Sequence, residues 1–440
     1  MLFGSVLAVL GGLVSACFSL GLCLYVASRV GGGSPAPGLI NFLLLWAIFG
    51  AAPLGLGIWL LRSPGESQRF WKRFMLALLL LFLAVGADGN FGPNNWRRAF
   101  ARERLPPSDA SKLQRTLITP HVDAPITPGT NLIWCGTFQL AWNEACQLAG
   151  GDLKFAGGHP MVAAMNQRLF TKDDLDESSY VAMAGLTGEG IHEKIRSAVG
   201  DRFRGEFKPR FLPDQKLTPR PQDLVVYACL YKKLVFPTPF QRLEDRLDFA
   251  GRRVSAFGFV VGQTNSADLY GQVLVLDYQS ADDFIIELKT KSHGDRLILA
   301  KLPPGEDLHT TIRRVGERVA QSQPQPAPTN DVLVVPRMKF DITRSYSEIQ
   351  GLRLIPQNPQ IAKDLLLVSA TQNILFEMNE RGAELRSEAY VGLGCAAHIL
   401  PEPKHRMIFD KPFLLLMQRH DAKFPYLAVW VDNPEILISW

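Results

Sequence analysis

The stretch Asp223-Leu-Val-Val-Tyr-Ala-Cys-Leu-Tyr231 decides how the rest of this chain is interpreted. Its nine residues are almost all apolar, and several are β-branched or aromatic. A run this short does not make an independent helix, but it suits a strand that is buried inside a sheet. The stretch therefore predicts a buried strand.

Similar runs recur on both sides of this strand. Upstream, residues 131–148 have the pattern of a strand that leads into a helix. Downstream, short apolar runs predict further strands at 273–276, 296–302, 332–335, 365–378, 413–417 and 426–431. Because strands dominate the second half and helices cluster earlier, we predict an α+β fold with large mixed sheets.

Composition excludes one class of partner. The chain has 440 residues, of which 47% are apolar and 20% charged, and its net charge is +5. A charge this small gives no reason to expect a nucleic-acid partner. The charges are also uneven, because residues 1–90 carry very few of them.

The almost uncharged first 90 residues predict a transmembrane region in contact with lipid. Three apolar runs, 2–27, 38–61 and 71–87, approach or exceed the roughly 20 residues that cross a bilayer as a helix. A signal peptide is the alternative for the first run, although no Lys or Arg precedes it. An interfacial helix is the alternative for the third run, which is the shortest.

The basic residues between Arg62 and Arg73 predict the orientation. The positive-inside rule places this loop in the cytoplasm, so a third crossing carries the remaining chain to the extracytoplasmic side. If the third run does not cross, the remainder stays cytoplasmic. We predict a linker at 91–130 and a globular domain at 131–440.

No enzymatic, metal or cofactor site is expected. The cysteines outside the first apolar run have no metal-ligand spacing, which favours buried thiols, with one disulfide as the alternative. The histidines also lack ligand spacing. Gly392-Leu-Gly-Cys-Ala-Ala397 fits a dinucleotide-binding pattern, but Pro401 and Pro403 follow and no βαβ unit surrounds it.

The segments taken in order resemble the serpin family. Asp223–Phe240 is similar to the family's strand ending Asn-Ala-x-Tyr-Phe-Lys-Gly-x-Trp-x-x-x-Phe, with matches at Ala228, Tyr231, Lys232 and Phe240. Later segments also fit: the strand pair 273–278 and 297–303, then 335–340 with Tyr346, and the closing hairpin 409–434. The resemblance covers roughly 300 residues and implies a serpin-like fold over 131–440.

The resemblance implies a reactive loop at 382–408. Glu377-Met-Asn-Glu-Arg-Gly-Ala-Glu384 resembles the family's hinge Glu-Val-Asn-Glu-Glu-Gly-Thr-Glu. The predicted hinge residues are Glu380, Gly382, Ala383, Glu384, Leu385, Ser387 and Ala389. Alternate residues from Ala383 are small or apolar, so they could face a core while their neighbours face solvent. Leu385, Arg386 and Glu388 nevertheless interrupt the run of small residues that active inhibitors have.

The family's sheet-opening region is altered here. Cys135, Gly136 and Phe138 stand where the family has Ser, Pro and Ser, and Tyr227 stands where it has Asn. These four residues are therefore predicted to form the sheet-opening region, and they leave the opening mechanism in question.

The resemblance implies a suicide inhibitor of a serine-type endopeptidase, anchored to a membrane by residues 1–90. The bond expected to be cut lies at Ala396–Ala397, whose small side chains would suit an elastase-like protease. The alternative is a non-inhibitory serpin-fold module that binds another protein or supports a membrane complex.

Overall fold

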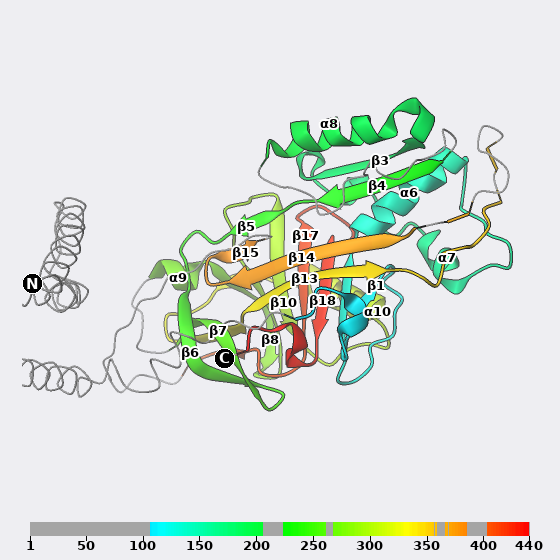
Figure 1. The fold of residues 1–440 in the computed structure, drawn as a ribbon. Helices are drawn as coiled ribbons and strands as arrows, with labels where there is room; N and C mark the ends of the chain where they lie inside the picture. The colour runs from blue at the N-terminus through cyan, green and yellow to red at the C-terminus, as the bar shows by residue number, and fades with distance from the viewer. Residues whose placement is uncertain are drawn as a thin grey trace, which may run out of the picture. The chain divides into compact units, whose positions relative to one another are not determined.

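The computed structural model describes residues 106–205, 223–260, 267–355, 357–358, 366–367, 369–384 and 403–439, which belong to one compact unit (Figure 1). Three sets of predictions lie outside these residues: the membrane spans 2–27, 38–61 and 71–87, the loop positions Leu385, Ser387 and Ala389, and the bond Ala396–Ala397. Among the described helices, none has the length and apolar character needed to cross a membrane.

An eight-stranded sheet forms the core. All its pairs are antiparallel except β1 with β2. In spatial order its strands are β1 (Thr116–Thr119), β2 (Asn131–Cys135), β18 (Leu427–Val431), β17 (Phe413–Arg419), β10 (Asp295–Lys301), β9 (Asp283–Leu288), β8 (Val273–Ser280) and β11 (Gln325–Pro326). The central strands are apolar on both faces, so they are covered on both sides. Strand β1 lies within the stretch expected to be a linker, so strand pairing begins before residue 131.

Two four-stranded sheets accompany the core sheet. One contains β16 (Arg406–Ile408), β12 (Val332–Pro336), β7 (Arg252–Phe259) and β6 (Gln241–Phe249), in that order. The other contains β13 (Met338–Ser345), β14 (Thr371–Asn379), β15 (Gly382–Glu384) and β5 (Lys233–Val235). A separate two-stranded sheet contains β3 (Tyr180–Leu186) and β4 (Leu224–Leu230).

Helices cover these sheets from several directions. They are α6 (Thr137–Ala149), α7 (Pro160–Met165), α8 (Ile191–Phe203), α9 (Ala267–Gly271) and α10 (Leu308–Ala320). Helix α6 packs against both β3 and β4, and α8 packs mainly against β3 (Figure 1). Short 3-10 turns occur at Ala110–Lys112, Lys172–Asp174, Glu177–Ser179, Thr187–Glu189 and Pro434–Ile436.

Local sequence signals explain the ends of the main helices. Asp307 accepts a hydrogen bond from the Thr310 backbone N–H and so caps α10. Helix α6 ends at Gly150, whose φ of 79° is unfavourable for other residues. The polar cap and the glycine are local signals for these boundaries. Distant contacts add to them, since Leu308 N–H donates to the Ala124 carbonyl at the start of α10 and Asn358 Nδ2 donates to the Leu148 carbonyl at the end of α6.

The predicted strands are largely present, with one difference. The strand expected at 223–231 is β4, and those expected at 413–417 and 426–431 are β17 and β18. The run predicted as a strand at 365–378 becomes a strand only from Thr371. One further bond continues the pairing with β13, since Tyr346 N–H donates to the Ala370 carbonyl. Earlier in the run, Leu366 and Leu367 form an isolated bridge with residues 351–353 instead of pairing with β13. Together these elements form the predicted α+β fold with mixed sheets.

Candidate functional site

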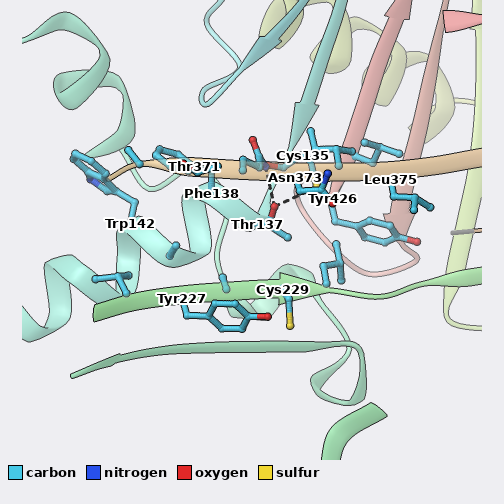
Figure 2. Close-up of a pocket in the computed structure, with 18 of the residues that line it drawn as sticks. Cys135, Thr137, Phe138, Trp142, Tyr227, Cys229, Thr371, Asn373, Leu375 and Tyr426 are labelled. Carbon is cyan, nitrogen blue, oxygen red and sulfur yellow. Dashed lines mark hydrogen bonds between the residues drawn. The ribbon is translucent and has the colours of Figure 1, made fainter. Parts of the chain in front are cut away.

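The candidate site is a slot between strands β4 and β14. The structure describes no hydrogen-bonded pairing between these two strands. A cavity of about 250 Å³ separates them, and α6 together with the ends of β2, β17 and β18 forms its floor (Figure 2). An open position between two strand edges has the shape of a missing strand.

Strand β15 already occupies one end of this position. Gly382, Ala383 and Glu384 pair with β14 on one side and with β5 on the other, and both pairings are antiparallel. Ala383 is 1% exposed and packs in the main core. The predicted hinge residues at 382–384 are therefore a short strand inside the sheet, and the slot continues where this strand ends.

Gly382 is required by the close approach of β15 to β5. Its φ is +148°, which other residues rarely adopt. A Cβ at this position would lie 2.1 Å from the Leu234 carbonyl oxygen, far inside contact distance. No side chain fits here unless the two strands separate.

Buried ion pairs hold the turn before β15. Arg337 contacts Glu380 at 3.4 Å, and both side chains are nearly inaccessible to solvent. Lys339 pairs with Glu377 at 3.0 Å, while Asn379 donates to the same carboxylate. The predicted hinge residue Glu380 thus fixes the start of β15 to the β13–β14 hairpin, since Arg337 directly precedes β13.

Side chains alternate along both walls of the slot. From β14, Gln372, Ile374 and Phe376 are buried, whereas Thr371, Asn373 and Leu375 are less buried. From β4, Val226, Ala228 and Leu230 pack with the clusters on the α6 side, whereas Val225, Tyr227 and Cys229 join the cluster around α8. Any strand filling the slot would need the same alternation.

Three of the four predicted sheet-opening residues lie together at the start of α6. Cys135 ends β2, Gly136 precedes the helix, and Phe138 lies in its first turn. A Cβ on Gly136 would meet the Phe170 ring at 2.2 Å, so proline does not fit here. Phe138 packs on Tyr346 with ring centroids 4.4 Å apart, so its ring joins the apolar cluster around α6.

Tyr227 does not join this group, although it lies along the same slot. Its ring is on the face of β4 that is turned away from α6, beside Cys229 (Figure 2). Because successive side chains of a strand alternate, Val226 and Ala228 take the inner face instead. Burial and the neighbouring Cys229 thiol raise the pKa of Tyr227, so its hydroxyl stays neutral.

Sequence reasoning missed the polar bridge beneath the slot. Gln372 Nε2 donates to the Cys135 carbonyl at 3.0 Å and to Thr137 Oγ1 at 2.8 Å. Its Oε1 accepts from the Tyr346 hydroxyl at 2.7 Å. This network ties β14 to the start of α6. The sequence did contain a signal for this bridge. The alternation along β14 puts Gln372 on the same buried face as Ile374 and Phe376.

Two buried cysteine thiols line the slot. Cys135, Cys146 and Cys229 are free thiols in the described part of the chain, and Cys135 and Cys229 belong to the lining of the slot. Burial raises the pKa of the Cys229 thiol to about 11, so it is protonated at neutral pH. Among the described residues, no group of His, Cys, Asp or Glu has the geometry of a metal site.

Comparisons with known proteins give limited information. No family model and no curated protein matches the chain. Among solved structures, a serpin of Manduca sexta is 12% identical, covering 69% of this chain and 93% of its own, with a TM-score of 0.42. Serpin48 of Tenebrio molitor is 12% identical, covering 70% and 92%, with a TM-score of 0.40. A serpin of Schistosoma mansoni is 13% identical, covering 68% and 95%, with a TM-score of 0.37.

Proposed function

We propose that residues 131–440 form a serpin-like domain that inhibits a serine-type endopeptidase by inserting its cut loop into the slot. One observation carries the proposal: β15 already occupies the strand position whose continuation between β4 and β14 is empty of described residues. A loop that continued β15 would gain hydrogen bonds to both walls of the slot.

The register of β15 indicates which loop residues would face the floor. Continuing its pairing residue by residue puts Ser387 between Leu230 and Ile374. Ala389 would follow between Ala228 and Gln372, two places further along. These inward positions receive small side chains, and Arg386, Glu388 and Tyr390 would face outward, which supports insertion.

The inhibitor proposal predicts a covalent complex. Full-length protein in detergent is incubated with elastase-like, trypsin-like and subtilisin-like proteases and then run on denaturing gels. A band at the summed mass that survives boiling would support trapping. Cleavage near Ala396 without such a band would contradict it.

A matched pair of variants tests insertion itself. Ser387→Arg puts a charged side chain on the inward face, where it would have to be buried between apolar neighbours. Glu388→Arg puts the same side chain on the outward face. We expect Ser387→Arg to abolish the boiling-resistant band and Glu388→Arg to retain it. Equal effects of the two changes would contradict the register.

A second candidate function, a non-inhibitory binding module, is supported by the size of Leu385. The same register puts Leu385 between Lys232 and Phe376, where a large side chain would cost about 1–3 kcal/mol through overpacking. Slow insertion lets a protease complete hydrolysis. The domain would then be a non-inhibitory binding module, and clean cleavage in the gel assay would favour it.

We also propose that residues 1–90 anchor the domain to a membrane, with the domain on the extracytoplasmic side. The uncharged runs and the basic Arg62–Arg73 loop support this. Alkaline extraction of membranes that leaves the chain in the pellet would support anchoring. Protection of the domain from protease added outside intact cells would contradict the orientation.

A further inference from the structure

The slot is flanked by two walls that are attached to the floor separately. Strand β14 is attached through Gln372, which bonds to Cys135 and Thr137 beneath it. Strand β4 continues into β5 through Tyr231 and Lys232, and Lys232 provides the second attachment.

Lys232 reaches from the slot into a neighbouring polar hollow. Its side chain lines the slot beside Phe376 and Tyr426. Its Nζ lies 3.0 Å from Asp295 Oδ2, and the two side chains are 11% and 5% exposed. Asp295 also accepts from Ser292 Oγ at 2.7 Å and from the Tyr426 hydroxyl at 3.2 Å. A buried carboxylate with three donors makes a rigid attachment point.

A backbone contact adds to this attachment. Lys291 N–H donates to the Val235 carbonyl at 2.7 Å, so the turn between β9 and β10 holds the strand on both sides of Lys233. Both contacts attach the β4–β5 junction to the eight-stranded sheet, and neither involves β14.

We infer that Lys232 is a positioning residue that keeps the slot open beyond β15 in the uncut protein, because it fixes the end of β4 to the eight-stranded sheet while β15 separates β5 from β14. Two neighbouring strand edges would otherwise gain hydrogen bonds by pairing directly. The occupant for which this space is kept is the segment that follows Glu384, because β15 ends at the mouth of the slot. The identification of this segment as the occupant of the slot rests on the proposed function.

An open slot changes what insertion requires. A sheet closed between β4 and β14 would have to break a ladder before a strand could enter. With the two walls held apart, the incoming segment only makes hydrogen bonds, and preorganisation of the site speeds its entry.

The test compares Lys232→Met with Lys289→Met in the full-length protein. Lys289 is an exposed residue at the end of β9, near the same turn, so its variant controls for the loss of a lysine. Asp295→Asn is a second variant that removes the charge with little change of shape. One measurement is backbone amide exchange in β4 and β14 of the uncut protein. The other is the rate at which nicked protein gains thermal stability.

We expect the amides on the slot edges to exchange rapidly in the wild-type and Lys289→Met proteins. In Lys232→Met and Asp295→Asn, closure should protect them, while β17 and β18 stay protected and so show that the fold is intact. Nicked Lys232→Met should gain stability roughly tenfold more slowly, since a hydrogen bond to a charged group is lost.

The outcomes separate this inference from the proposed function. If nicked wild-type protein gains stability and both Lys232→Met and Asp295→Asn match it in rate and exchange, the inference is overturned and insertion stands. If no nicked protein gains stability, insertion fails, and the exchange pattern of the uncut proteins alone decides whether Lys232 holds the slot open.

Discussion

At the scale of single residues, Gly382 is the most constrained position of the site. Its φ of +148° and its approach to the Leu234 carbonyl leave no room for a Cβ. We expect Gly382→Ala to displace β15 and to lower the free energy of unfolding by roughly 1–3 kcal/mol, the range for strained backbone positions. Urea denaturation measures this change.

The control is Gly316→Ala, in the exposed part of helix α10. A Cβ there meets nothing within 4 Å, and alanine favours helices over glycine. This variant should be neutral or slightly stabilising. If both alanines had the same effect, the close approach of β15 and β5 would not be the cause.

The thiols along the slot should be unreactive. Burial raises the pKa of Cys229 to about 11, and burial also raises the pKa of Cys135. At pH 8 both thiols are protonated in the folded protein, so iodoacetamide should modify them far more slowly than in urea. Peptide mapping by mass spectrometry would identify each site.

Reactivity should increase as pH approaches the raised pKa. If Cys229 were alkylated in the folded protein at pH 8 as fast as in urea, the described burial would be wrong. A further slowing of Cys135 after the loop is cut would also report that the slot had been filled.

At the scale of elements, two Tyr→Phe changes can separate the stability that comes from the bridge between β14 and α6 from the effect of burying a tyrosine hydroxyl. Tyr346→Phe removes the donor to Gln372 Oε1 and leaves a buried acceptor unpaired. We expect it to reduce the free energy of unfolding by about 1–3 kcal/mol. Chemical denaturation monitored by fluorescence would measure the difference.

Tyr227→Phe is the matched control for the same chemical change. The Tyr227 hydroxyl is buried and makes no hydrogen bond among the described residues, and it lies beside the Cys229 thiol. Its removal should be neutral or stabilising, because the cost of burying the hydroxyl disappears. A larger loss in Tyr227→Phe than in Tyr346→Phe would contradict the assignment of the bridge.

At the scale of the whole molecule, cutting the loop should stabilise the domain. An inserted segment would pair with both β4 and β14 and would cover the apolar residues of the slot. With several new hydrogen bonds of about 1 kcal/mol each, we expect the melting temperature to rise by roughly 10 °C or more. Differential scanning calorimetry before and after nicking measures the shift.

The nicked Ser387→Arg protein is the control for this rise, because its inward arginine should prevent insertion. An unchanged or lower melting temperature for nicked wild-type protein would favour the binding-module function. A rise in both proteins would mean that nicking stabilises the domain by another route.

Much of the fold follows from local patterns. The apolar runs of β17 and β18 are readable because a strand buried in a sheet has a short continuous apolar sequence. The run at 223–231 also forms a strand, but β4 is mostly half-buried, because within the described residues it pairs only with β3 and borders the slot. The start of α10 is readable because Asp307 is a local cap. The strand prediction was wrong for Leu366 and Leu367, because they form an isolated bridge with residues 351–353 and do not pair with β13.

The candidate site was only partly predictable. The sequence by itself indicated the alternation of small and charged residues beyond Gly382, because a strand has a period of two. Tertiary structure alone decided that β15 lies between β14 and β5, that Tyr227 faces away from α6, and that Gln372 and Lys232 attach the two walls. The contacts of Lys232 with Asp295 and of Gln372 with Cys135 join residues 63 and 237 positions apart, and no local pattern encodes such pairings.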